Sequence, residues 1–281
     1  MPAGVINYQD ALKVLVSVKG HPFERDPFGD MFEAMEGVSA TFVDQPASSE
    51  LLNPEAMSEF DVLCLYDMPG IDFMHADAPG YVSPPQRMVE GINRLLDSGK
   101  GIVALHHSIA GWPAWPEYAD YLGGRFLYRP DTLRGQSCPD SGYRHDVTHT
   151  VSRILGTDEI FEPIFDGLPS SFQLTDELYL SQVFERDVIP LLRSDYEFSA
   201  SNFYSAKQAV MGNMYSREGW RHGNASNVVA WVKRARNSPL VYIQFGDGPE
   251  TYKDPNFRRL LANALKWVSG EPALSWAAQS G

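Results

Sequence analysis

The chain contains 281 residues, 43% of them hydrophobic, which is enough for the core of one large α/β domain or two small ones. Its formal net charge is -13, from 36 acidic and 23 basic side chains, so the protein should repel nucleic acids and anionic membrane surfaces. The N-terminal stretch MPAGVINYQDALKVLV lacks a basic segment followed by an apolar one, and no apolar run is long enough to span a membrane. We therefore expect a cytoplasmic protein with no nucleic-acid or membrane partner.

Short apolar runs alternate with helical patterns in the first half of the chain, which is typical of βαβ units with a mostly parallel sheet. Strands are expected at 11–18, 39–44, 61–67 and 101–107, and a short helix around 27–36. Asn53 and Ser83 are each followed by proline, a pattern that predicts a helix start, and Gly99 is expected to end the second of these helices.

The pattern changes after residue 125 to extended segments, FLYRPDTL, HDVTHTV, SFQLTDELYL and VIPLLRS, separated by Pro, Gly and Asp turns. Farther on, NVVAWVKRA and SPLVYIQF flank Arg236 and Asn237 as in a hairpin or β-arch, and DPNFRRLLANALKWVSG predicts a final helix. Because no internal repeat or linker interrupts the chain, we expect one α/β domain over 1–281 with an elaborated β-rich region at about 125–235.

The two cysteines do not indicate a disulfide framework. Cys64 lies within the apolar run DVLCLYD, whereas Cys138 lies in the loop-like stretch GQSCPDSG. Free cysteines are commonly buried, so we expect Cys64 to pack in the core rather than to act as a nucleophile.

Polar residues follow several of the predicted strands. Ligands bind beyond the carboxyl ends of parallel strands, so these residues could converge on one crevice. They are His21 after the first strand, Asp67 after the third, His106 and His107 after the fourth, and Asp247 and Glu250 after the last.

The adjacent histidines His106 and His107 should point to opposite faces for as long as the strand continues. We favour His106 for the site and His107 for packing, although a shift of one residue would reverse this assignment. His21 has two open interpretations, a solvated loop residue or a site residue, because Gly20 would permit a tight turn.

Two further pairs have alternative interpretations. Trp112 and Trp115 could stack on a sugar, but packing of the following helix is the favoured interpretation. Asp176 and Glu177 lie among apolar neighbours and are either a solvated turn or a carboxylate pair with acid and base roles.

Motifs with defined chemistry are missing from the sequence. It has no CxxC or HExxH for zinc, no GxSxG elbow and no glycine-rich phosphate loop. A divalent metal ion held by His21, His106 and a carboxylate remains an alternative, because ligands from separate loops leave no spacing pattern.

Five segments resemble, in chain order, the trehalose-utilization ThuA-like proteins: VKGHPFERDPF, FDVLCLYDMPG, GKGIVALHHSIAGWPAWPEYADYLGGRF, TDELY and LVYIQFGDGPETYKDPNFRRLLANALKWVSG. The resemblance spans nearly the whole chain and is most specific around LHHSIAGW. It implies a class I glutamine amidotransferase-like fold, which is a doubly wound, mostly parallel flavodoxin-like sheet. It also implies a role in carbohydrate metabolism.

The resemblance also shows what this chain lacks. In glutamine amidotransferases the equivalent turn carries a cysteine nucleophile, and a QFHPE motif supplies its base; here the turn carries His106 and His107, and the later stretch reads QFGDGPE. Without thiolate and base, glutamine hydrolysis is excluded. Many ThuA-like proteins carry Gly-His where this chain has Gly246 and Asp247, so an inherited role for this loop does not follow.

The leading hypothesis is an enzyme, an isomerase, lyase or hydrolase, that acts on a disaccharide or keto-sugar by acid and base chemistry. His106, His107 and His21 would be its catalytic residues. Seven further residues would contact the substrate: Asp67, Trp112, Trp115, Asp176, Glu177, Asp247 and Glu250. One alternative is a metal-dependent hydrolase using the same pocket, and another is a non-catalytic sugar-binding or regulatory protein, with homo-oligomerisation left open in each case.

Overall fold

The computed structural model describes residues 11–75 and 79–279. The expectation about a leader segment falls largely on residues 1–10, which lie outside this part. In the described residues, no helix has the combination of length and apolar character that would let it cross a lipid bilayer.

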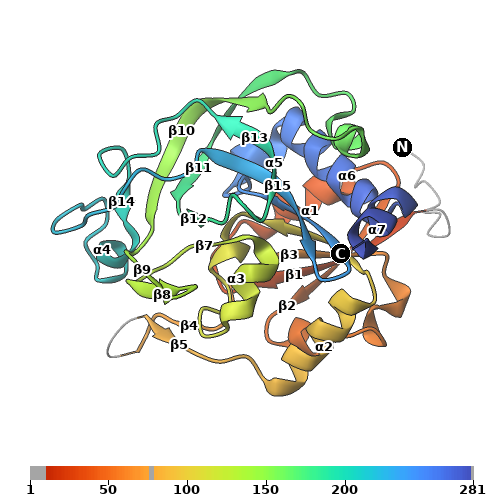
Figure 1. The fold of residues 1–281 in the computed structure, drawn as a ribbon, viewed down its shortest axis with the longest axis horizontal. Helices are drawn as coiled ribbons and strands as arrows, with labels where there is room; N and C mark the ends of the chain where they lie inside the picture. Colours follow the sequence, from red (N-terminus) through yellow and green to blue (C-terminus); the bar gives the residue numbers. More distant parts are fainter. Residues whose placement is uncertain (1–10, 76–78, 280–281) are drawn as a thin grey trace.

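A ten-stranded sheet forms the centre of the described part, with the order β11-β10-β13-β15-β16-β6-β3-β1-β2 and β14 paired to β10 (Figure 1). The five strands from β2 to β16 are parallel, and the sheet continues from β16 through antiparallel pairs. The parallel strands are β1 (Leu12–Lys19), β2 (Val38–Asp44), β3 (Val62–Asp67), β6 (Gly101–Leu105) and β16 (Ser238–Ile243). The antiparallel strands are β10 (Gly142–Arg153), β11 (Ser171–Leu180), β13 (Ile189–Ser194), β14 (Tyr204–Ser205) and β15 (Val228–Ala235).

Helices cover both faces of the sheet. Alternate strand residues point to opposite sides, so both faces carry apolar side chains that the helices bury. Val16, Cys64 and Val103 pack on the side of α1, α6 and α7, whereas Leu15, Leu63 and Ile102 pack on the side of α2 and α3. Cys64 is thus a core residue, as expected. The helices are α1 (Arg25–Glu33), α2 (Gln86–Asp97), α3 (Pro116–Leu122), α4 (Ala206–Val210), α5 (Pro249–Lys253), α6 (Pro255–Ser269) and α7 (Glu271–Ala278).

Short elements fill the connections. Three two-stranded ribbons pair β4 (Ile71–Asp72) with β5 (Gly80–Tyr81), β7 (Gly124–Arg125) with β12 (Gln182–Val183), and β8 (Asp131–Leu133) with β9 (Gln136–Cys138). Four 3-10 turns are η1 (Ala47–Glu50), η2 (Ala56–Glu59), η3 (His106–Ala110) and η4 (Glu159–Phe165). The β-rich character expected between 125 and 235 is therefore present, and most of it extends the central sheet.

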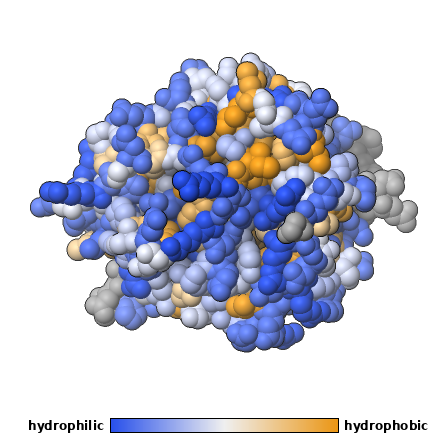
Figure 2. Space-filling model, viewed as in Figure 1, coloured by the Kyte–Doolittle hydropathy of each residue, from blue (hydrophilic) through white to orange (hydrophobic). Residues whose placement is uncertain are grey.

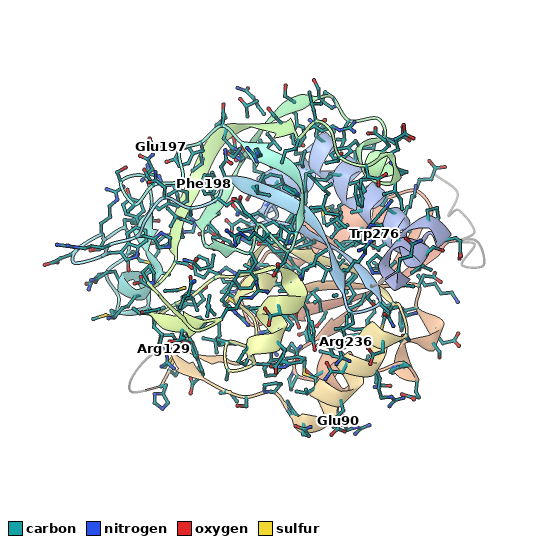
Figure 3. All side chains as sticks on the ribbon, in the orientation of Figure 1. Glu90, Arg129, Glu197, Phe198, Arg236 and Trp276 are labelled. Atoms are coloured by element: carbon teal, nitrogen blue, oxygen red, sulfur yellow. The ribbon has the colours of Figure 1, made fainter. Side chains whose placement is uncertain are left out.

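The predicted hairpin is confirmed, since β15 and β16 pair antiparallel around Arg236 and Asn237. The Arg236 guanidinium donates to the Asp97 carboxylate of α2 at 2.8 Å, and the Arg234 guanidinium lies 4.4 Å from the centroid of the Trp276 ring in α7. Figure 3 labels Arg236 and Trp276. These contacts tie the hairpin to helices on both faces of the sheet. Figure 2 shows a largely hydrophilic face in this view, with apolar residues gathered in patches above its centre.

Three details of the predicted elements were wrong. The helix expected after Asn53 is only the 3-10 turn η2, because β3 follows too soon for a longer helix, although the Asn53 side chain does accept from the Ala56 amide at 3.0 Å. The helix α2 begins at Gln86, so Ser83 precedes it without capping it. The strand β6 ends at Leu105, and both histidines therefore belong to η3 rather than to the strand.

Candidate functional site

The histidines His106 and His107 begin the turn that follows β6, where the alternation of strand side chains no longer applies. His106 has φ of +44°, an uncommon conformation for a residue with a Cβ. Its imidazole is fully buried, with Nδ1 2.7 Å from the carbonyl oxygen of Gln244, and its own carbonyl accepts from the Tyr242 hydroxyl at 2.8 Å. The orientation of the His106 ring is thus set by the end of the neighbouring strand β16.

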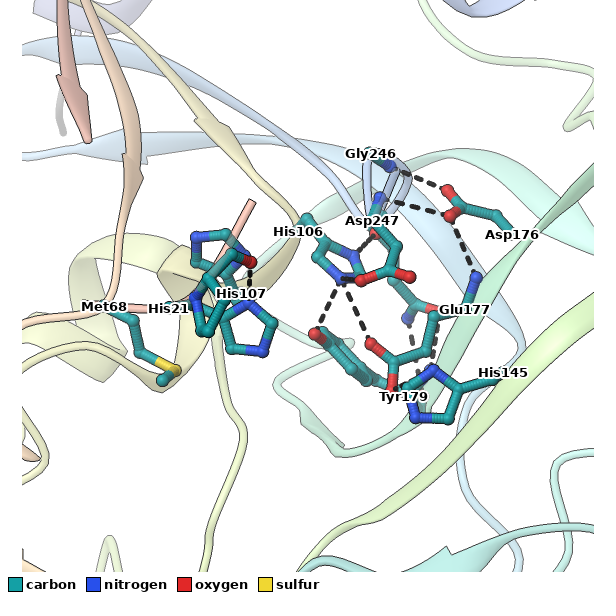
Figure 4. A network of polar contacts seen from close by, with 12 residues as sticks. His21, Met68, His106, His107, His145, Asp176, Glu177, Tyr179, Gly246 and Asp247 are labelled. Atoms are coloured by element: carbon teal, nitrogen blue, oxygen red, sulfur yellow. Dashed lines mark hydrogen bonds and ion pairs between the residues drawn. The ribbon is translucent and has the colours of Figure 1, made fainter. Parts of the chain in front are cut away.

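Three oxygens surround the other ring nitrogen of His106 (Figure 4). Nε2 lies 2.8 Å from the hydroxyl of Tyr179, 3.2 Å from Oε2 of Glu177 and 3.4 Å from Oδ1 of Asp247. These four side chains, His106, Glu177, Tyr179 and Asp247, are called the His106 cluster below. Residues from β11, from the turn after β6 and from the loop after β16 thus meet at one point.

Strand β11 supplies two members of the cluster, because Glu177 and Tyr179 are two residues apart and lie on the same face. The side chain of Gln244 fixes this strand by accepting from the Tyr179 amide at 3.0 Å. Asp247 comes from the loop after β16, where Gly246 has φ of +121° and its α-carbon faces the rings of Phe257 and Tyr66. That conformation favours glycine and turns the chain toward the cluster.

Asp176 does not contact His106 but holds the segments that do. Its carboxylate accepts from the amides of Gly246 at 2.7 Å, Asp247 at 3.1 Å and Glu177 at 2.9 Å. The side chain is buried, which raises the pKa of Asp176 to about 6, although the nearby His106 and the amides act in the opposite direction. Asp176 therefore joins the strand that carries Glu177 to the loop that carries Asp247.

The charges within the cluster favour a protonated His106. Burial by itself would lower the pKa of His106, but hydrogen bonding to Asp247 and Glu177 outweighs burial and raises it well above 6.5. Burial would likewise raise the pKa of Asp247, yet the hydrogen bond to His106 leaves it below its usual value. A positive charge at Nε2 is what stabilises two carboxylates in this buried position.

A cavity of about 190 Å³ lies in front of the cluster, with Glu177, Tyr179, His21 and His145 among its lining residues. Phe126, Tyr128, Tyr143 and Met214 supply much of its apolar wall. His145 lies where the pairing of β10 with β11 is irregular, and its Nδ1 is 3.6 Å from Oε1 of Glu177. Glu177 thus contacts His106 through one oxygen and His145 through the other.

His107 lies beside the cluster but takes no part in it. Its ring is buried, with Nε2 3.2 Å from the carbonyl oxygen of Tyr66, and it stacks on His21 with ring centroids 4.7 Å apart. Burial lowers the pKa of His107 well below 6.5, with a further contribution from His21. Burial also lowers the pKa of His21. Both rings are therefore held neutral, and of the two only His21 lines the cavity.

Four other residues suggested by the sequence are not brought to the cluster. Asp67 is buried on the opposite face of the sheet from Tyr66, where it accepts from Ser17 at 2.7 Å and from Gln45 at 2.6 Å. Trp112 lines an internal cavity together with Asp67, and Trp115 packs against Tyr118. Glu250 is exposed in the first turn of α5. The fold therefore brings five of the suggested residues to the cluster or its cavity: His21, His106, Asp176, Glu177 and Asp247.

Sequence reasoning missed Tyr179 and His145. Tyr179 could have been found once Glu177 was chosen, because a spacing of two residues shares a strand face. His145 carries no such signal, since only the pairing of β10 with β11 brings it to Glu177.

The set of described residues with spacing suitable for a metal ion is His106, Glu177 and Asp247, whose ligand atoms lie within 4.8 Å of one another. His21, suggested as a ligand from the sequence, is not in this set.

The family of this chain is identified by a match to a known family model. A family model described as ThuA, trehalose utilisation, matches residues 13–268, which is most of the sequence. The chain belongs to the ThuA family. The matched range contains every residue of the His106 cluster.

Solved structures of ThuA-like proteins have the same fold. One from Bacteroides uniformis is 19% identical, with 96% of this chain and 98% of that chain covered and a TM-score of 0.61. Another, from Parabacteroides merdae, is 14% identical, with 92% and 90% covered and a TM-score of 0.61. No curated protein matches the sequence. The ThuA family thus relates the chain to trehalose utilisation without specifying a reaction.

Proposed function

We propose that the protein is a carbohydrate-processing enzyme that acts by proton transfer on a trehalose-type disaccharide or its keto derivative. The observation that carries the proposal is the position of Glu177, whose carboxylate bridges His106 and His145 at the wall of the cavity. Membership of the ThuA family supports a sugar as the substrate.

The cavity has the composition of a small-ligand site. Its walls are mostly aromatic or apolar, and its polar groups converge from Glu177, His145, His21 and Tyr179. A volume of about 190 Å³ is below the range of about 300–1,000 Å³ for larger ligands, so it suits one sugar ring better than a whole disaccharide. Aromatic side chains can pack against the apolar face of such a ring.

The pair of Glu177 and His145 is suited to move a proton. In a keto-sugar, the C–H bond beside the carbonyl is acidified, and a base that takes this proton leaves the electron pair on the carbonyl oxygen. Glu177 would accept the proton and pass it to His145, and the Tyr179 hydroxyl, polarised by the protonated His106, would stabilise the oxygen. Return of the proton to the former carbonyl carbon or oxygen would complete an isomerisation, and cleavage of the bond to the glycosidic oxygen, which leaves with the proton, would complete an elimination.

The parallel strand order β2-β1-β3-β6-β16 supports the finer assignment of a flavodoxin-like scaffold related to glutamine amidotransferases. Glutaminase activity is not part of the proposal. The turn after β6 carries His106 and His107 in place of a cysteine, and Cys64 is a buried residue of β3 whose thiol pKa is raised by burial.

The proposal is tested by incubating the full chain with trehalose and with enzymatically oxidised keto-trehalose, and following the products by mass spectrometry. Turnover should fall by about 100-fold or more in Glu177→Gln and by a smaller factor in His145→Gln. Glu185→Gln, which changes an exposed carboxylate in the same chemical way, should retain full turnover. Unchanged turnover in Glu177→Gln would contradict the mechanism, and no turnover of any sugar would favour a binding protein.

A further inference from the structure

In the His106 cluster, two carboxylate oxygens face Nε2 of the imidazole, and one proton on this nitrogen balances only one of their two negative charges. Because Nδ1 of His106 lies 2.7 Å from a carbonyl oxygen, it must carry a proton, and a neutral ring then presents the lone pair of Nε2 to its surroundings. Those surroundings are the hydroxyl of Tyr179 and the carboxylates of Glu177 and Asp247. The lone pair and the two carboxylates repel one another, so Nε2 needs either the second proton described above or a cation in its place.

The charge in this region is larger than one proton balances. Glu177 and Asp247 place two carboxylates against one imidazole, and Asp176 adds a third carboxyl group that accepts from the amides of the segments carrying them. In the described part of the chain, Glu177 and Asp247 form ion pairs with histidines and with no lysine or arginine. A cation of charge two would neutralise both carboxylates that face Nε2.

The distances also fit a metal ion. Bonds of about 2.0–2.2 Å at tetrahedral or octahedral angles place neighbouring ligand atoms roughly 3.0–3.5 Å apart. The separations of 3.2 Å and 3.4 Å from Nε2 to the two carboxylate oxygens lie in this range, and the three ligand atoms are all within 4.8 Å of one another. The carbonyl of Gln244 fixes the His106 tautomer and Asp176 holds both carboxylate segments, as partners of metal ligands commonly do.

We propose that His106, Glu177 and Asp247 bind a divalent transition-metal cation, of the type of Zn²⁺ or Mn²⁺. One imidazole nitrogen and two carboxylate oxygens select such ions over Ca²⁺ and Mg²⁺, which prefer oxygen ligands alone. Three protein ligands leave at least one position open, and Glu177 lines the cavity while the Asp247 side chain is 34% exposed. The ion can therefore enter from the cavity and meet an oxygen atom bound there.

The catalytic role of this cation site rests on the proposed function. The cation would carry the positive charge that the proposed mechanism places beside the sugar oxygen, with His145 as the adjacent group that accepts a proton. The ion-binding measurement is independent of turnover, so either proposal can fail alone.

The first experiment measures binding of Zn²⁺, Mn²⁺, Co²⁺, Mg²⁺ and Ca²⁺ to the full chain after chelator treatment and dialysis, by calorimetry and elemental mass spectrometry. We expect one equivalent of Zn²⁺, Mn²⁺ or Co²⁺ and much weaker binding of Mg²⁺ and Ca²⁺. Bound Co²⁺ should show visible absorption bands that report nitrogen and oxygen ligands directly. Failure to retain any of the three transition metals in stoichiometric amount would overturn the proposal.

The second experiment compares isosteric variants. Glu177→Gln and Asp247→Asn should each weaken Zn²⁺ binding by about 100-fold or more, and Glu185→Gln should not change it. Circular dichroism and thermal unfolding check that each variant is folded, and Asp247→Asn alters a partly exposed side chain, so a folding defect is less of a concern there. Undiminished binding in both folded variants would place the metal elsewhere and overturn the assignment.

Turnover separates the two proposals. Stoichiometric metal binding without turnover of any sugar supports the cation site and contradicts the proposed function. Turnover by a chain that binds no metal supports the proposed function and overturns the cation site. Turnover that is lost with the chelator and restored by Zn²⁺ or Mn²⁺ supports both.

Discussion

The carboxylate of Asp176 accepts a hydrogen bond from the backbone amide of Asp247 at 3.1 Å, although the two residues belong to β11 and to the loop after β16. The same carboxylate accepts from the amides of Gly246 and Glu177. Asp176 thus sets the distance between the two carboxylates of the His106 cluster without contacting the histidine. It is a positioning residue.

Asp176→Asn should lower kcat/KM by about 100-fold, because one amide group would face backbone N–H donors and the loop would move away from β11. Steady-state kinetics on the keto-sugar substrate checks this. The matched control is Asp195→Asn, since Asp195 also accepts from a strand amide, that of Thr150 at 2.8 Å, but is exposed and is not a member of the His106 cluster. Equal losses in the two variants would show that the effect is one of general stability.

Tyr179→Phe removes the hydroxyl that lies 2.8 Å from Nε2 of His106 while keeping the ring that stacks on it. We expect kcat to fall by roughly 10²-fold with little change in KM, as for loss of a single donor to a developing negative charge. Tyr196→Phe loses a hydroxyl bonded to the carbonyl of Asn202 and should keep its kcat. A kcat of Tyr179→Phe equal to that of the parent would remove the hydroxyl from the mechanism.

Gly246→Ala should destabilise the protein by about 1–3 kcal/mol, because a residue with a side chain is strained at φ of +121°. Urea unfolding measures the difference. Gly248→Ala is the control from the same loop, since Gly248 has φ of -156° and open space around its α-carbon, and it should cost much less. A near-neutral Gly246→Ala would indicate that the loop relaxes easily.

The buried Asp67 should make stability depend on pH. Burial raises the pKa of Asp67 from 3.8 to about 6 in the folded protein, although Gln45 and Ser17 donate to it, so the folded chain binds this proton more tightly than the unfolded chain does. The contribution of Asp67 to the free energy of unfolding is therefore fully present below about pH 4 and is lost as the pH rises through about 6. The difference is about 3 kcal/mol.

Asp67→Asn removes this titration while keeping an oxygen that can accept from Ser17 and Gln45. The variant should match or fall below the parent in stability near pH 4 and exceed it near pH 8, when both are compared by urea unfolding. A constant difference between variant and parent across this interval would mean that Asp67 does not titrate as described.

Local patterns determined much of the fold. The apolar runs that became β1, β3 and β6 are buried on both faces, and hydrophobic runs of that kind specify parallel strands without knowledge of the partners. Helices α2 and α6 follow from apolar spacing, and Gly99 ends α2 with a positive φ. The segment LHHSIAGW indicated the ThuA family, which the family model confirms.

The composition of the His106 cluster was decided only by the tertiary structure. His106 and Glu177 are both in the sequence prediction, but nothing local indicates that Glu177 of β11 meets the turn after β6. These two strands are not neighbours in the sheet, so the contact depends on the course of the whole sheet. The orientation of His106 depends on η3 beginning one residue after Leu105, which the alternation of a strand could not predict. Asp67 shows the converse: it ends a strand as expected, yet side-chain alternation buries it on the other face of the sheet, away from the cavity.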